Sequence, residues 1–177
     1  MKKIRFILPA LILFLGGCNE FDKLTQFNME FDQTVTIPAV TDISLPVDTE
    51  IPDIESNSES KMSVNNSSKD LAEEVLLKEF KLAVNTPADG NFSFLKSIAV
   101  YLSADSLEEV KVAWLDSIPD NCGDSLILTT TNADLKDYIL KDSFNFRVNT
   151  VIDKVITSEY KIDMHSVFYV DTKILGQ

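Results

Sequence analysis

The chain has 177 residues, with 16 lysines and arginines against 28 aspartates and glutamates, and its formal net charge is −12 at pH 7. Such an acidic surface argues against binding to nucleic acid or to an anionic lipid face, because either partner would repel it. With 45% hydrophobic residues, the chain is long enough for one domain with a substantial core and short for two.

The N-terminus predicts export from the cytoplasm. Three basic residues within positions 1–5 precede an apolar run over residues 6–15, which is too short to span a bilayer and is typical of a secretory signal peptide. The run ends in Leu-Gly-Gly-Cys at residues 15–18, which resembles the bacterial lipobox. The resemblance implies diacylglycerol on the Cys18 thiol, cleavage just before it and acylation of the new amino terminus. An ordinary signal peptide and an N-terminal core strand remain the alternatives.

The chain therefore divides into a signal peptide (1–17), a lipidated tether (18–24) and a folded domain (25–177). Because the signal peptide carries three basic residues and no acidic one, its removal changes the formal charge from −12 to −15. We expect a lipoprotein of the cell envelope, held at the outer membrane through its lipid anchor. Residues 19–22 resemble the acidic stretch after the cysteine in surface-exported lipoproteins of Bacteroidota, and the periplasmic and surface faces both stay open.

Alternating apolar residues predict a series of strands in the folded domain. They cover residues 27–37, 43–47, 76–84, 98–102, 110–114, 126–130, 144–148 and 159–174. Pro46 marks the second of them as an edge strand or a bulge. The Asp-Gly pair within residues 86–91 predicts a turn, and the i,i+4 spacing of Leu135 and Ile139 predicts a short helix.

A polar stretch separates the second and third strands. Residues 49–68 are rich in serine, asparagine and glutamate, and they predict a flexible loop. Ser67 or Ser68 is expected to cap a short helix over residues 69–75, although residues 70–82 also fit a single amphipathic helix. The whole pattern predicts an all-β fold, a single antiparallel β-sandwich of Ig-like topology with one or two short helices. This body resembles small lipoproteins of Bacteroidota, and that resemblance implies no activity.

The residues for catalysis are few. His165 is the sole histidine, and after lipidation of Cys18 the sole free thiol is Cys122, so no intrachain disulfide is expected. A Cys122–His165 nucleophilic pair is conceivable, but Asp120 and Asp124 would raise the pKa of the thiol by like-charge repulsion. We therefore expect no enzyme and no cofactor.

Acidic loop residues offer a possible metal site. Asp116, Asp120 and Asp124 are weak candidates for a calcium site, but Cys122 and Gly123 do not fit the spacing of an EF-hand loop. A solvated acidic turn is the alternative.

Three serines lie in Asp-Ser-apolar triplets. Ser106, Ser117 and Ser125 each match a pattern similar to the acceptor motif of Bacteroidota O-glycosylation. The alternative is that Asp-Ser pairs simply open strands or cap turns.

The expected function is that of a membrane-anchored, non-enzymatic binding or structural module of the cell envelope. Its partners are expected to be the membrane, through the lipid anchor, and an envelope protein, with residues 49–68 and 116–124 as contact surfaces. A carrier or sensor of a hydrophobic or glycan ligand is an alternative, with Trp114, Phe144 and Phe146 as its pocket if they are not core residues. A small hydrolase is a further alternative.

Overall fold

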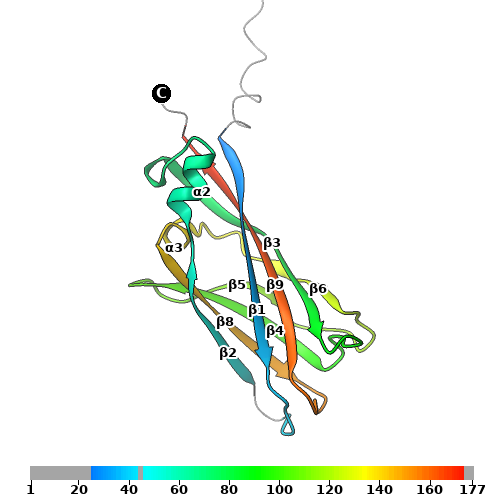
Figure 1. Cartoon of the computed structure of the whole chain (residues 1–177). Coiled ribbons are helices and arrows are strands. Elements are labelled where there is room, and N and C mark those ends of the chain that lie inside the picture. The colour runs from blue at the N-terminus through cyan, green and yellow to red at the C-terminus, as the bar shows by residue number, and fades with distance from the viewer. Residues whose placement is uncertain (1–24, 44–45, 174–177) are drawn as a thin grey trace, which may run out of the picture.

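The computed structural model describes residues 25–43 and 46–173 as two packed antiparallel sheets (Figure 1). The strands are β1 (Gln26–Ile37), β2 (Val47–Glu55), β3 (Ala72–Thr86), β4 (Leu95–Ala104), β5 (Val110–Leu115), β6 (Ser125–Ile127), β7 (Thr129–Thr130), β8 (Ser143–Ile152) and β9 (Tyr160–Thr172). The helical segments are α2 (Ser58–Val64), η2 (Lys69–Leu71) and α3 (Lys136–Ile139). One sheet has the order β1-β9-β3-β6 and the other β2-β8-β4-β5-β7, so the predicted antiparallel β-sandwich with short helices is confirmed.

The strand order follows from a nested set of pairings. β1 pairs with β9, β2 with β8, β3 with β6 and β4 with β5, as if the chain were one long hairpin. Two further pairings, of β9 with β3 and of β8 with β4, fold this ribbon into two sheets. The result is a jelly roll. The expected Ig-like topology is wrong, because in that fold the last two strands are neighbours, whereas β8 and β9 lie in different sheets.

The sandwich has two distinct ends (Figure 1). The start of β1 and the finish of β9 meet at one of them, where the Thr172 N–H donates to the Thr25 carbonyl at 3.1 Å, and α2, η2 and α3 lie near this end. We call it the terminal end. The opposite, distal end carries the β3–β4, β5–β6 and β8–β9 loops together with residues 38–43, which bridge to the β8–β9 loop between Val40 and Ile156.

Aromatic rings fill the space between the sheets. The ring centroid of Phe31 in β1 lies 5.0 Å from that of Phe144 in β8, and Phe80 in β3 lies 5.5 Å from Phe146 in β8. Both pairs join opposite sheets edge to face, a favourable geometry for aromatic side chains. Phe144 and Phe146 are therefore core residues and not the wall of a pocket, whereas Trp114 is only partly buried.

The expected flexible loop at residues 49–68 is wrong. Most of β2 and all of α2 lie within it, and Ile54 and Met62 are buried in the core. Ser56 and Ser58 are also buried, and their hydroxyls hydrogen bond to each other at 3.0 Å. Two of the serines that suggested a solvated loop are therefore buried hydrogen-bonding groups.

The segment after α2 also differs from expectation. Instead of a helix over residues 69–75, the 3-10 turn η2 ends at Leu71 and β3 begins directly, so the single amphipathic helix over 70–82 is wrong as well. The period-two burial of Val75 and Leu77 accounts for the strand. The strand expected at 126–130 is split into β6 and β7 by the buried Leu128. The long last strand β9 is confirmed, and the predicted helix is found as α3, which with four residues is shorter than the expected two to three turns.

The predicted Asp-Gly turn connects β3 and β4. The Gly90 N–H donates to the Pro87 carbonyl at 2.9 Å. A Cβ atom at Gly90 would lie 2.7 Å from Cγ1 of Val84, so the close approach of the two chain segments requires glycine there.

Candidate functional site

The sequence-predicted modification sites lie on different parts of the molecule. Cys18, the expected lipidation site, lies outside the described residues. Ser106, in the β4–β5 turn near the terminal end, has φ 62° and an exposed side chain. Ser117 and Ser125 are exposed in or beside the β5–β6 loop at the distal end. All three serines are therefore open to solvent, as an acceptor of a sugar must be.

The three aspartates proposed for calcium do not form a site. Asp116, Asp120 and Asp124 are all exposed, and the carboxylate of Asp120 instead receives the Lys154 ammonium at 2.7 Å. In residues 25–43 and 46–173 no three histidine, cysteine, aspartate or glutamate side chains gather as metal ligands would. The calcium candidate is thus corrected to a solvated acidic loop with one ion pair.

Cys122 and His165 belong to different surroundings. Cys122 packs against the core at the β5–β6 loop, and burial is the largest cause of the raised pKa of its thiol. Asp120 raises that pKa too, as predicted, but it is a smaller cause. Nδ1 of His165 lies 2.7 Å from Oδ1 of Asp32 on the outer face of the β1-β9-β3-β6 sheet. A raised pKa keeps the Cys122 thiol in its neutral form, which is a weak nucleophile.

The outer face of the same sheet carries a groove that sequence reasoning missed. It has a volume of about 710 Å³ and is formed by β1, β9 and β3, which run side by side in Figure 1. We call it the outer groove; its lining residues are Asp32, Gln33, Thr34, Glu79, Lys81, Ala83, Asp163, Met164 and His165. Cross-strand register explains the gathering, because Asp32 lies opposite His165 and His165 opposite Lys81.

Hydrogen bonds hold the acidic groups of the outer groove in place. Thr34 Oγ1 donates to one carboxylate oxygen of Asp163 at 2.8 Å, and Asn85 Nδ2 donates to the other at 2.9 Å. These two hydrogen bonds, with that of Asn85 the larger cause, lower the pKa of Asp163 and keep it ionised. The signal for such a face in the sequence is the run of polar residues at alternate positions of β1 and β9.

A second hollow, of about 600 Å³, lies beside α2 and is lined mainly by serine and acidic side chains. Lys69 and Asp142 cross its edge as an ion pair with an Nζ to Oδ1 distance of 3.2 Å. Nearby, Lys61 of α2 donates to the Glu30 carbonyl of the edge strand β1 at 2.7 Å, with its Nζ 3.6 Å from the ring centroid of Phe31. Burial lowers the pKa of Lys61. These contacts fasten α2 to the edge of the sandwich.

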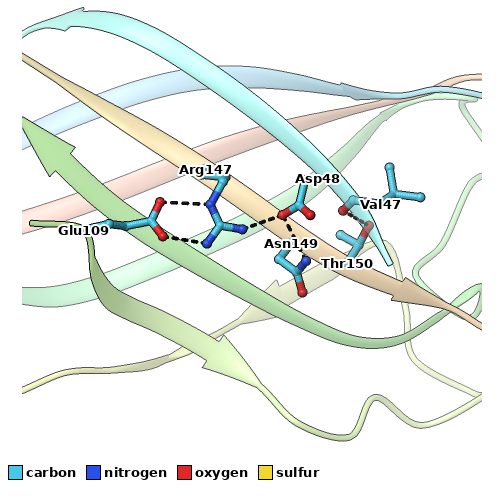
Figure 2. Close-up of polar contacts among 6 residues, drawn as sticks. All are labelled: Val47, Asp48, Glu109, Arg147, Asn149 and Thr150. Atoms are coloured by element: carbon cyan, nitrogen blue, oxygen red, sulfur yellow. Dashed lines mark hydrogen bonds and ion pairs between the residues drawn. The ribbon is translucent and has the colours of Figure 1, made fainter. Parts of the chain in front are cut away.

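The outer face of the other sheet carries an arginine-centred network (Figure 2). Arg147 of β8 donates to both carboxylate oxygens of Glu109, at 2.9 and 2.6 Å, and also to Asp48 of β2. Asn149 donates to Asp48 at 3.0 Å, and the guanidinium carbon lies 4.2 Å from the ring centroid of Tyr101. The network links the edge strand β2 to β8 and to the β4–β5 turn, so its role is structural.

The sequence matches no protein-family model and no curated protein. Among solved structures, it is similar to those titled Desmodium yellow mottle tymovirus and turnip yellow mosaic virus, each at 9% sequence identity. The first alignment covers 100% of this chain and 95% of that chain with a TM-score of 0.30, and the second covers 100% and 92% with a TM-score of 0.29. TM-scores this low do not establish a shared fold or function. In the part of the chain that the structure describes, no helix is long and apolar enough to cross a membrane.

The arginine network predicts a specific response to acid. Arg147 is the largest cause of the lowered pKa of Glu109, and the Asn149 hydrogen bond is the largest cause of that of Asp48. Carboxyls with lowered pKa values stabilise the fold above their unfolded pKa of about 4, and this stabilisation is lost as the pH falls through the folded values. Arg147→Met should lower the free energy of unfolding by about 1 kcal/mol at neutral pH and by less at about pH 3.

Urea unfolding at both pH values checks this expectation, with the exposed Lys96→Met as the matched control. The control should change stability by less than about 0.5 kcal/mol at either pH. A stability difference between wild type and Arg147→Met that stays constant on acidification would contradict the ionic role of the network.

Proposed function

We propose that the protein is a lipid-anchored, non-enzymatic binding module of the bacterial outer membrane. The observation that carries the proposal is the Leu-Gly-Gly-Cys sequence at residues 15–18, placed directly after a basic start and a short apolar run. Several acyl chains on Cys18 would hold a soluble domain at a membrane without a spanning helix. The strong negative charge suits a domain that stands off the membrane and stays soluble.

The length of the tether limits how the folded domain can be oriented at the membrane. Thr25 lies seven positions after the proposed anchor Cys18, and a fully extended chain of that length reaches at most about 25 Å. An anchored molecule would therefore keep its terminal end, with α2 and α3, nearest the lipid. The distal loops would point away from the membrane, with Ser117 and Ser125 among them as the proposed glycosylation sites.

The packing between the sheets favours binding at a surface over carriage of an apolar molecule. The edge-to-face pairs Phe31–Phe144 and Phe80–Phe146 occupy the middle of the sandwich, where a carrier would need a cavity. The two hollows described above open instead to solvent and are lined mainly by polar residues. These features best support a protein that binds another component of the envelope at its surface.

Two measurements on the full chain, carrying a C-terminal tag, test the proposal. Growth with an alkyne-bearing palmitate analogue should label the wild-type protein, and gentle solubilisation of membranes should co-purify an envelope protein in stoichiometric amount. Absence of the fatty-acid label would contradict the anchor. A labelled protein that yields a lipid or a glycan but no protein partner would replace the module by the carrier or sensor alternative.

A further inference from the structure

The outer groove combines side chains from three strands on a single face. Asp32 and Thr34 come from β1, Asp163 and His165 from β9, and Glu79 and Lys81 from β3. Residues two apart on a strand point to the same side of the sheet, and neighbouring strands lie about 4.8 Å apart. The groove is therefore a compact polar surface built on the rigid part of the fold rather than on loops.

The charge of the groove is negative. Three carboxylates, on Asp32, Glu79 and Asp163, face one ammonium group, that of Lys81. Counted without His165, the lining has a formal charge of −2. The surface charge of the chain has the same sign, so the field around the groove repels anions and attracts cations.

The acceptors of the groove are held in position before any ligand arrives. Thr34 and Asn85 hold the carboxylate of Asp163, and Asp32 is in contact with His165 at 2.7 Å. A carboxylate oxygen has two lone pairs, so Asp163 can accept a further donor at each oxygen. A site whose acceptors are already oriented loses less conformational entropy when it binds.

The shape and lining narrow the kind of ligand. The volume of about 710 Å³ lies within the range of about 300–1,000 Å³ that is usual for ligand sites, and the small side chain of Ala83 leaves room between the neighbouring strands. Phenylalanine, tyrosine and tryptophan are absent from the lining, so the groove offers no platform for a flat apolar molecule or a sugar ring. Its open face suits a polar side chain from an extended partner.

The groove lies on the distal half of the sheet. Asp163 is nine residues before Thr172 along β9, which corresponds to about 30 Å from the terminal end. In an anchored molecule this half would face away from the lipid and toward other envelope components.

We propose that the outer groove binds a lysine- or arginine-bearing segment of a partner protein, with Asp32, Glu79 and Asp163 receiving its cationic groups. The inference rests on the proposed role of the chain as a binding module and names the chemistry of its partner. The N–H groups of an ammonium or guanidinium group would donate hydrogen bonds to the remaining lone pairs of the three carboxylates.

Nuclear magnetic resonance tests the proposal directly, because His165 is the sole histidine of the chain and lies in the groove. The full chain, purified in detergent with a histidine-free tag and labelled at histidine, gives one set of imidazole signals. A short peptide of alternating lysine and alanine should shift these signals in a saturable way, and added salt should weaken its binding. A glutamine–alanine peptide of equal length is the neutral control.

Charge variants test whether the groove attracts the peptide through its negative charge. Glu79→Gln and Asp163→Asn should each weaken binding of the lysine peptide by about fivefold, and Lys81→Met should strengthen it by a similar factor. The exposed Asp137→Asn, on α3 near the terminal end, should leave the affinity unchanged. Thermal unfolding followed by circular dichroism establishes that each variant is folded.

Three outcomes would overturn the inference: no shift with the lysine peptide, equal shifts with the glutamine peptide, or weaker binding by Lys81→Met. Shifts caused by a neutral oligosaccharide such as maltotriose, and not by the lysine peptide, would make the groove a glycan site instead. The peptide assay does not depend on acylation. Peptide binding by a chain that lacks the fatty-acid label would therefore overturn only the proposed function, and an acylated chain that ignores the peptide would overturn only this inference.

Discussion

Replacement of Cys18 by alanine is expected to move the protein completely from the membrane fraction to the soluble fraction. Each buried methylene of an acyl chain contributes about 0.8 kcal/mol, so loss of all the chains proposed for Cys18 would remove the whole attachment. The described residues contain no helix that could replace it as an anchor. Fractionation of cells expressing the variant, with immunoblotting of both fractions, measures the effect.

The second cysteine provides a matched control. Cys122→Ala removes the other thiol of the chain but leaves residues 15–18 intact, so the variant should stay in the membrane fraction and keep the fatty-acid label. Membrane retention of Cys18→Ala, or release of Cys122→Ala, would contradict the proposal that Cys18 is the lipidated residue.

Phe144→Ala is expected to cause a large loss of stability, because the ring lies in the middle of the core. Phe144 is 1% exposed, and its ring lies 5.0 Å from Phe31, 5.3 Å from Phe146 and 6.4 Å from Phe168, between ring centroids. Truncation of a buried phenylalanine removes these contacts and leaves a cavity, at a cost of about 3–5 kcal/mol. Because domains are stable by only about 5–15 kcal/mol, this change would consume much of the total.

Urea unfolding followed by circular dichroism measures the loss, and Val64→Ala is the control. Val64, at the end of α2, is 77% exposed, so its truncation should change the free energy of unfolding by less than about 0.5 kcal/mol. A Phe144→Ala midpoint close to that of Val64→Ala would show that the rings do not form the stabilising core described above.

Local patterns predicted the strands well where burial alternates strictly. In β8 the apolar residues Phe144, Phe146 and Val148 are buried and their neighbours are not, so period two alone identifies the strand. The polar stretch 49–68 was misread because its composition outweighed two buried residues, Ile54 and Met62. Serines that bond to each other inside a fold look, in sequence, like serines in solvent.

Local sequence patterns could not predict the strand order or the outer groove. An Ig-like and a jelly-roll sandwich use strands of the same periodicity, and only the choice of partners distinguishes them. Asp32 and His165 are 133 positions apart, and their contact depends on the register of β1 against β9. The same holds for Arg147 on β8 and Glu109 in the β4–β5 turn, which are 38 positions apart.

The nested pairing of the strands has a consequence for the order of events during biogenesis. β1, the first strand to emerge, has its hydrogen-bonded partner in β9, the last, so the β1-β9-β3-β6 sheet cannot close until nearly the whole chain is present. Contacts between distant segments make folding slow, because the chain loses the entropy of closing a long loop before the contacts can stabilise it. If the chain is exported, as proposed, slow closure of this sheet would leave the polypeptide unfolded while it crosses the membrane, so that the sandwich would complete on the far side.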